Sequence, residues 1–253
     1  MQLEDVVAVV TGGASGLGEA CVRGIVERGG RAAIFDMQAG PGGELARELG
    51  DQAAFMEVDV TDDASVAQGI AKAVERFAKI NVTINCAGIG GPCKVLSSKG
   101  PIPMEFFEKR IQVNLIGTMR VLSLAAERMA QNQPNQEGER GVIINTSSVA
   151  ATQGQIGQVS YAASKGGING LMLPVAKELA RHGIRVVTIA PGVIETPMFK
   201  SVPEAAREAL TKSIPFPKRL GRASEYADLA AHLIENPYLN GEIFYLTGGL
   251  RMA

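Results

Sequence analysis

The chain has 253 residues, 46% of them hydrophobic and 20% charged, which indicates one large folded domain and excludes a disordered chain. Its net charge of −1 provides no phosphate-neutralising surface, so we expect no nucleic-acid partner. Three cysteines without metal-ligand spacing predict reduced thiols and no metal, and the lack of a signal region or a long apolar stretch predicts a soluble cytoplasmic protein without a membrane anchor.

Short apolar runs alternate along the chain with longer segments of helical period. The predicted strands are Val6–Val10, Ala32–Phe35, Ala53–Val58, Val82–Asn85, Val142–Thr146, Arg185–Ala190 and Ile243–Leu246. The predicted helices are Leu17–Arg28, Gly43–Leu49, Ala64–Phe77, Met104–Met129, Tyr161–Arg181, Pro203–Lys212 and Glu225–Glu235. This alternation predicts an α/β fold of one domain over residues 1–253, a doubly wound (Rossmann-type) parallel seven-stranded sheet with helices on both faces. Residues 90–103 and 131–140 are predicted surface insertions.

The first predicted strand leads into a glycine-rich loop, TGGASGLG at residues 11–18, that opens the first predicted helix. Unpaired N–H groups and the dipole at a helix N-terminus suit a pyrophosphate. Gly12, Gly16 and Gly18 allow a tight turn, close backbone approach to the ligand and close helix packing. The position of this loop at the first strand–helix junction therefore predicts a dinucleotide site, with Ser15 and Leu17 in contact with the cofactor.

An acidic residue, Asp36, ends the second predicted strand, 18 residues after Gly18. A carboxylate there accepts hydrogen bonds from an adenosine ribose diol and repels a 2′-phosphate. Neither Ala14 nor Met37 offers a positive charge that would offset this repulsion. We therefore predict NAD rather than NADP as the cofactor.

Two further strand ends contribute to the predicted cofactor site, because ligands of doubly wound sheets bind outside the carboxyl ends of the strands. Asp59 and Val60 follow the third strand, where Asp59 is a candidate partner for the adenine amino group. The fourth strand runs into Cys86, Ala87 and Gly88, whose small side chains leave room for a ribose.

The candidate catalytic residues are Tyr161, Lys165, Ser148 and Asn114. Tyr161 and Lys165 are four residues apart in a helical segment, so they share a face, and a nearby ammonium lowers the pKa of a tyrosine. Ser148 directly follows a predicted strand and can donate a hydrogen bond to a substrate oxygen, and Asn114 is a candidate carrier of a water that links the lysine to solvent. A Tyr-x-x-x-Lys pair alone is more typical of a solvated helix face, and only the order of all these motifs favours catalysis. Gln155, six residues before Tyr161, is a candidate substrate contact or an ordinary loop glutamine.

In this order the motifs resemble those of the short-chain dehydrogenase/reductases over essentially the whole chain. The likeness is carried by residues 11–18, the Asn-x-Ala-Gly motif at 85–88, Asn114, Ser148, Tyr161, Lys165, Pro191, Gly192 and Thr196. Cys86 departs from the second Asn of many members. The resemblance implies that Pro191, Gly192, Val193 and Thr196 contact the nicotinamide, that Lys165 binds its ribose, and that Ser148 and Tyr161 hold the substrate oxygen.

Within that family the chain is similar to the type II 3-hydroxyacyl-CoA dehydrogenases. The shared segments are residues 140–146, 190–192, 214–217, 219–221, 235–242 and the insertion at 90–103. This likeness implies NAD-dependent interconversion of (3S)-3-hydroxyacyl-CoA and 3-oxoacyl-CoA in fatty acid metabolism, and a homotetramer. The residues alone indicate only a secondary alcohol or ketone as substrate, with the two long apolar helices as a plausible pairing surface.

Three alternatives stay open at this point. The first is a dehydrogenase of steroids or other hydrophobic secondary alcohols, which the same site could serve. The second is a 3-oxoacyl-carrier-protein reductase, against which Asp36 and Ala14 argue because such reductases normally favour NADPH. The third is a cofactor-binding scaffold protein, which has no need of an intact Ser148, Tyr161 and Lys165.

Overall fold

The apolar runs form one parallel sheet of seven strands, as the sequence predicts. The computed structural model describes residues 1–200, 202 and 204–252. The strand order is β3-β2-β1-β4-β7-β8-β9, and every neighbouring pair is parallel. The strands are β1 (Val7–Thr11), β2 (Arg31–Asp36), β3 (Ala53–Glu57), β4 (Val82–Asn85), β7 (Gly141–Thr146), β8 (Ile184–Pro191) and β9 (Ile243–Leu246).

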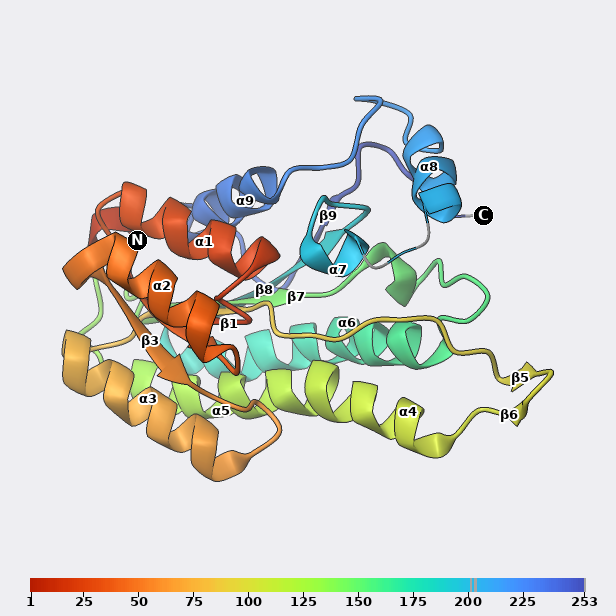
Figure 1. The fold of residues 1–253 in the computed structure, drawn as a ribbon. Helices are drawn as coiled ribbons and strands as arrows, with labels where there is room; N and C mark the ends of the chain where they lie inside the picture. Colours follow the sequence, from red (N-terminus) through yellow and green to blue (C-terminus); the bar gives the residue numbers. More distant parts are fainter. Residues whose placement is uncertain (201, 203, 253) are drawn as a thin grey trace.

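Helices cover both faces of this sheet (Figure 1). One layer holds α1 (Gly16–Glu27), α2 (Ala39–Leu49) and α9 (Ala223–Glu235). The other layer holds α3 (Asp63–Phe77), α4 (Met104–Arg110), α5 (Gly117–Met129) and α6 (Val159–Leu179). Two short helices, α7 (Pro197–Lys200) and α8 (Glu204–Lys212), follow β8 near the described C-terminal end.

Alternate side chains of each strand enter opposite cores, which explains why the runs are apolar at nearly every position. Along β1, Ala8 and Val10 pack with the α1 and α9 side chains, whereas Val7 and Val9 pack with those of α3 and α5. All four side chains are fully buried. Burial of a valine-sized side chain contributes roughly 1.5–3 kcal/mol, so a polar residue at any of these positions would destabilise the sheet.

The chain changes direction across the sheet between β1 and β4. From β1 it proceeds to β2 and then β3 on one side, and from β4 it proceeds through β7 and β8 to β9 on the other side. The connections that leave β1 and β4 therefore diverge and open a crevice at the carboxyl ends of these strands. This crevice is where the structure gathers the glycine loop, the Asp36 strand end and residues 86–88.

The long helix predicted over Met104–Met129 is wrong as a single α-helix, because a π-helical turn, Ile111–Ile116, separates α4 from α5. The turn contains the fully buried Asn114, whose Oδ1 accepts a 2.8 Å hydrogen bond from the Ile89 N–H and whose Nδ2 donates to the Ile89 carbonyl and to Ser164 Oγ. These contacts with two other segments hold Asn114 in place, and the wider turn accommodates it.

Other boundaries differ from the predictions by a few residues. The helix predicted to begin at Gly43 begins at Ala39. Pro41 is compatible with the first turn of this helix, because the backbone nitrogens there donate no intrahelical hydrogen bond. The insertion at 90–103, predicted as a loop, contains a hairpin of β5 (Leu96–Ser97) and β6 (Gly100–Pro101). The predicted helix Pro203–Lys212 corresponds to α8, and Pro203 lies outside the described residues. No helix within the described part of the chain is long and apolar enough to cross a bilayer.

Candidate active site

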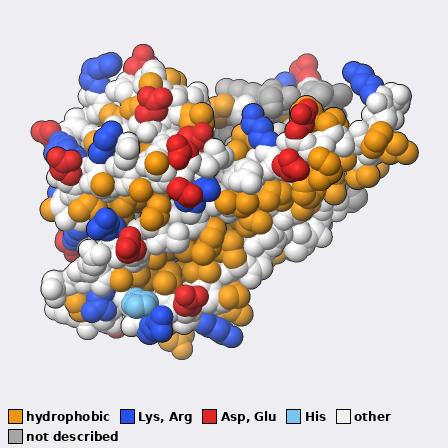
Figure 2. All heavy atoms as spheres, turned by 90° about the horizontal axis from the view of Figure 1, so that it is seen from below, with side chains coloured by type: hydrophobic (Ala, Val, Ile, Leu, Met, Phe, Trp, Pro, Cys, Tyr) orange, Lys and Arg blue, Asp and Glu red, His pale blue; other side chains and the backbone are white. Residues whose placement is uncertain are grey.

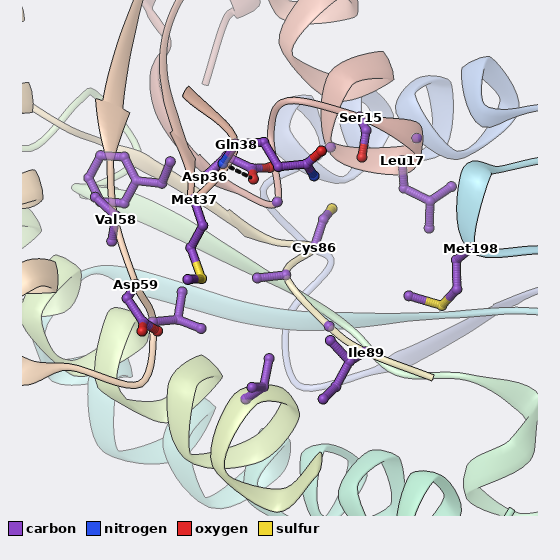
Figure 3. A pocket seen from close by; sticks show the side chains of 18 of the residues that line it. Ser15, Leu17, Asp36, Met37, Gln38, Val58, Asp59, Cys86, Ile89 and Met198 are labelled. Atoms are coloured by element: carbon purple, nitrogen blue, oxygen red, sulfur yellow. Dashed lines mark hydrogen bonds between the residues drawn. The ribbon is translucent and has the colours of Figure 1, made fainter. Parts of the chain in front are cut away.

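A cavity of about 900 Å³ lies at the carboxyl ends of β1, β2, β3 and β4 (Figure 3). It collects most of the residues predicted to bind the cofactor. Those that line it are Gly12, Ser15, Gly16, Leu17, Gly18, Asp36, Asp59, Val60, Cys86, Ala87, Gly88 and Thr196. The fold therefore brings together, around one cavity, predicted cofactor contacts from segments almost 200 residues apart in the sequence.

The glycines of the loop are required by its geometry. Gly12 and Gly16 have φ values of +62° and +58°, in the left-handed region that side chains disfavour. A Cβ on Gly18 would lie 2.2 Å from the Gly12 carbonyl oxygen, so no other residue fits there without movement. A Cβ on Gly12 would lie 3.0 Å from the Ala87 backbone, which means that the loop packs directly on the segment after β4.

Backbone amides orient the Asp36 carboxylate. Its Oδ2 accepts a 3.1 Å hydrogen bond from the Ala14 N–H, and its Oδ1 accepts a 3.0 Å bond from the Gln38 N–H (Figure 3). Each carboxylate oxygen keeps lone-pair capacity for a ligand. Asp59 is held in a similar way, since its Oδ1 accepts hydrogen bonds from the N–H and hydroxyl of Thr61. The two carboxylates are thus directed along one wall of the cavity.

A second cavity of about 390 Å³ adjoins the first and shares Leu17, Thr196 and Met198 with it. Its polar residues include Ser148, Tyr161, Gln155 and Gln158. Pro191, Gly192 and Val193 form one wall, as the family resemblance implies for the nicotinamide end. The rest is largely apolar and includes Ile156, Phe199, Val202, Leu210 and Met252. This arrangement places a mainly apolar chamber next to the end of the dinucleotide-sized cavity.

Ser148 and Tyr161 interact within this second cavity. Ser148 lies just after the carboxyl end of β7. Its Oγ accepts a 3.1 Å hydrogen bond from the Ala150 N–H, which fixes the orientation of the hydroxyl. Burial raises the pKa of Tyr161 above its ordinary value, while a hydrogen bond with Ser148 acts in the opposite direction. Ser148 is the neighbour whose hydrogen bond favours the phenolate, and Lys165 lies farther away, with its Nζ 5.8 Å from the centre of the Tyr161 ring.

Lys165 lies behind Tyr161 and lines neither cavity. Its Nζ donates a 2.7 Å hydrogen bond to the Thr146 carbonyl and lies 5.8 Å from the centre of the Tyr161 ring. Burial lowers the pKa of Lys165 to about 8. A Cβ on Gly88 would be 3.7 Å from this Nζ and 3.4 Å from Asn114 Oδ1, so the glycine leaves Lys165 and Asn114 close to the ribose end of the first cavity.

Several lining residues were not predicted from the sequence. Lys109, Gln112 and Val113 face the first cavity from α4 and the π-helical turn, and their spacing of i, i+3 and i+4 would have predicted a shared face. Ile89 and Met37 also line this cavity (Figure 3). Met252 reaches the second cavity because its N–H donates to Gln153 Oε1, 99 residues earlier, and no local pattern predicts that contact.

The fold and the two cavities define a class of protein. A glycine loop at the direction change of a doubly wound sheet, an acidic strand end and a buried Tyr–Lys pair beside a serine are the parts of a nicotinamide-dependent oxidoreductase. The family model for short chain dehydrogenase matches residues 6–207. The chain therefore belongs to the short-chain dehydrogenase family, and the predicted membership is confirmed.

Individual relatives agree with this assignment. The chain is 47% identical over 252 residues to the human protein named 3-hydroxyacyl-CoA dehydrogenase type-2, covering 99% of this chain and 97% of that protein. Among solved structures, 3-hydroxyacyl-CoA dehydrogenase type-2 from Mycobacterium avium matches with a TM-score of 0.94 and 42% identity, over 100% of this chain and 98% of the other. The 3-ketoacyl-(acyl-carrier-protein) reductase from Brucella melitensis, complexed with NADH, matches with a TM-score of 0.88 and 28% identity, over 98% of each chain.

Proposed function

We propose that this chain interconverts (3S)-3-hydroxyacyl-CoA and 3-oxoacyl-CoA with NAD as the hydride carrier. One observation carries the proposal, namely that Ser148 and Tyr161 stand together in an apolar chamber that adjoins the dinucleotide-sized cavity. The apolar wall suits an acyl chain, and the two hydroxyls suit the oxygen at its third carbon. The names of the human and M. avium relatives support an acyl-CoA as the particular substrate.

The residues of the first cavity fit NAD. The positive φ values of Gly12 and Gly16 expose loop amides to a pyrophosphate, and a Cβ on Gly18 would collide with the loop. The oriented Asp36 carboxylate accepts the adenosine ribose hydroxyls, and Asp59 and Val60 border the adenine end. Ala87, Gly88, Pro191, Gly192, Val193 and Thr196 border the nicotinamide half, and the bound nicotinamide supplies the acceptor for hydride.

The protein side of the reaction is a proton transfer at Tyr161. In the oxidative direction the Tyr161 oxygen takes the proton of the 3-hydroxyl group while Ser148 Oγ donates a hydrogen bond to the same oxygen. The Lys165 ammonium favours the phenolate form of Tyr161 that is present before this transfer, and it binds the ribose next to Gly88. Asn114 holds the Ile89 segment beside this lysine, and Gln155, in the wall of the chamber, contacts the substrate.

Cofactor preference does not by itself separate this function from that of a carrier-protein reductase. The B. melitensis reductase is complexed with NADH, so binding of NADH is compatible with either activity. The thioester carrier must therefore be tested directly. This observation weakens the sequence argument that used Asp36 and Ala14 against such a reductase.

The deciding experiment follows absorbance of reduced nicotinamide with NADH and three ketone substrates at equal concentrations. These are acetoacetyl-CoA, the acetoacetyl thioester of an acyl carrier protein, and a ketosteroid. We expect the highest turnover efficiency with acetoacetyl-CoA, and no turnover by the Tyr161→Phe variant as the matched control. Comparable or better efficiency with the carrier-protein thioester or the steroid would refute the acyl-CoA assignment.

We further propose a homotetramer in the cytoplasm. Figure 2 shows hydrophobic side chains gathered over the face formed by α4, α5 and α6. Large apolar residues exposed on these helices and the turn between α4 and α5 are Met104, Phe106, Ile116, Met119 and Leu173. Such patches on a soluble protein are typical of subunit contacts. Light scattering after size exclusion tests the assembly. We expect the mass of four chains for the wild type and a smaller mass for Met119→Lys. A wild type with the mass of one chain would contradict the proposed tetramer.

A further inference from the structure

The chain that follows β4 contributes a wall to both cavities and runs past α4 to the β5–β6 hairpin (Figure 1). We call residues 89–93 the wall segment. Ile89 lines the first cavity (Figure 3), and the next three residues, Gly90, Gly91 and Pro92, line the second. The boundary between the cofactor side and the substrate side of the site therefore falls between two consecutive residues.

Two side chains that are four residues apart hold the two sides of this boundary. Asn114, in the π-helical turn, binds both the N–H and the carbonyl of Ile89. Arg110, at the end of α4, donates from Nη2 to the Gly91 carbonyl at 2.9 Å and to the Gly90 carbonyl at 3.1 Å. The cofactor side and the substrate side of the wall segment are therefore attached to the same helical stretch by different residues.

Arg110 is a buried cation, with 6% of its surface exposed, and it lines neither cavity. Its Nη1 donates a 3.1 Å hydrogen bond to the Phe106 carbonyl, so its hydrogen-bond partners within the described residues are all main-chain carbonyls. Its Nε is buried and has no partner among those residues. A guanidinium buried in this way is costly, and such local costs are expected mainly at functional sites.

The backbone at Gly91 fits the guanidinium closely. Gly91 has a φ of +113°, which disfavours a side chain, and a Cβ there would lie 3.1 Å from Arg110 Nη2. Because the carbonyls of Gly90 and Gly91 are directed at Arg110, which lies outside the second cavity, they are directed away from the substrate. The wall then presents Cα atoms and the Pro92 ring to the chamber, which matches its largely apolar character.

The far end of the wall segment supports a second part of the chamber. The Cys93 N–H donates a 2.7 Å hydrogen bond to the Gly157 carbonyl. Gly157 belongs to the loop that brings Gln155 and Gln158 into the second cavity. A displacement of residues 90–92 is therefore transmitted to this loop, and Arg110 stabilises both walls of the chamber at once.

We propose that Arg110 is the positioning residue for the substrate side of the active site. It holds residues 90–92 as a fixed apolar wall for the acyl group of the substrate, while Asn114 separately holds the cofactor side; the acyl group as occupant rests on the proposed function. Ser148 and Tyr161 lie on other elements, so the chemical step does not depend on this wall. Loss of Arg110 therefore weakens substrate binding, which raises KM and leaves kcat unchanged.

The kinetic test compares Arg110→Met and Arg110→Lys with Arg140→Met as the matched control. Arg140 also donates to main-chain carbonyls, those of Asn132 and His182, but it lines neither cavity. With acetoacetyl-CoA and saturating NADH, Arg110→Met should have a KM about tenfold higher, with kcat and the NADH dissociation constant within about twofold of the wild type. Arg110→Lys should recover part of the KM, and Arg140→Met should leave it unchanged.

An unchanged KM in Arg110→Met, an equal rise in Arg140→Met, or a loss confined to kcat would overturn the assignment. Should Arg110→Met not fold, Arg110→Lys decides by the same criterion, because an ammonium does not reproduce the planar set of donors of a guanidinium. Its KM should then exceed that of the wild type.

Hydrogen exchange, resolved by residue, tests the same assignment without turnover. The Ile89 N–H is bonded to Asn114 Oδ1 at 2.8 Å, and the Cys93 N–H is bonded to the Gly157 carbonyl at 2.7 Å. In Arg110→Met the Cys93 amide should exchange at least about tenfold faster, while the Ile89 amide keeps its wild-type protection. Equal changes at both amides, or none at Cys93, would overturn the proposal. If the exchange pattern is as expected but the wild type does not reduce acetoacetyl-CoA, only the proposed function is contradicted.

Discussion

The ammonium group of Lys165 donates its 2.7 Å hydrogen bond to the main-chain carbonyl of Thr146, the last residue of β7. This bond holds the positive charge behind Tyr161, with Nζ 5.8 Å from the ring centre. A neutral carbonyl compensates only in part for the loss of water around a buried ammonium, so burial lowers the pKa of Lys165 to about 8. The protein therefore holds a destabilised charge at the site where the chemistry requires one.

Replacement of this lysine should stabilise the fold. The unfolded lysine has a pKa near 10.5 and the folded one near 8, so below pH 8 both forms are protonated and the folded state carries the full penalty. The penalty is lost as the pH rises from 8 to 10.5. We expect Lys165→Met to have a free energy of unfolding at pH 7 that is higher than that of the wild type by on the order of 2–3 kcal/mol. The variant should show no turnover.

Urea unfolding of both proteins at pH 7 and at pH 10 measures this difference, which should shrink at the higher pH. Lys72→Met, an exposed position on α3, is the control and should show no pH-dependent change relative to the wild type. A Lys165→Met protein that is less stable than the wild type at pH 7 would contradict the argument.

Tyr161→Phe should lose turnover while it retains its fold and its affinity for NADH. In the proposed reaction the substitution removes the oxygen that accepts the substrate proton, and loss of a positioned acid or base lowers rates by roughly 10²–10⁴-fold. Steady-state kinetics gives the loss in kcat, and NADH fluorescence gives the binding constant. Retention of more than a tenth of wild-type kcat would remove Tyr161 from the reaction.

Ser148→Ala should lower kcat and move the pH profile. The serine hydrogen bond lowers the pKa of Tyr161, so its removal raises that pKa and shifts the alkaline rise of the oxidation rate to higher pH. Loss of one donor to the substrate oxygen costs roughly 10²–10³-fold in kcat. Ser123→Ala, at an exposed position on α5, is the control. An unshifted profile would mean that Ser148 does not act on the tyrosine.

Asp36→Ala should weaken the preference for NAD over NADP. The change removes the acceptor for the ribose diol and the charge that repels a 2′-phosphate, and a lost charged hydrogen bond is worth about 1.5–3 kcal/mol. The ratio of kcat/KM with the two cofactors should fall by at least tenfold. Glu44→Ala, an exposed position on α2, should leave it unchanged. An unaltered ratio in Asp36→Ala would show that another group selects the cofactor.

Arg185→Met should destabilise the fold strongly. This buried guanidinium forms an ion pair with Glu139 at 2.7 Å and donates to the carbonyls of Leu233, Ile234 and Leu239 around the end of α9. Its removal takes the donor from three carbonyls and leaves the buried Glu139 carboxylate with the N-terminal ammonium and Asn135 as its partners, which costs about 3–5 kcal/mol. Arg23→Met, which removes solvent-exposed pairs with Glu19 and Glu48, should lower the stability far less. Equal effects in thermal unfolding would contradict the distinction.

The α/β class, the seven strands and their buried character could be predicted from the sequence because they depend on local period. Fully apolar runs such as residues 6–10 indicate a strand covered on both faces, and the glycine loop identifies its own junction with α1. Much of the lining of the first cavity was also predictable, since the carboxyl ends of parallel strands share one edge. The π-helical turn at Asn114 was not, because the contacts that maintain it come from Ile89 and Ser164, 25 and 50 residues away.

By itself, then, the sequence determined the fold class, the strand-end motifs and the order of Ser148, Tyr161 and Lys165, all of which follow from short-range spacing. The tertiary structure decided which neighbour tunes each of these groups. In the folded chain, the hydrogen bond that lowers the pKa of Tyr161 comes from Ser148, and Lys165 donates to the Thr146 carbonyl. Electrostatic interactions depend on distance and burial, and both are set by how separate segments pack.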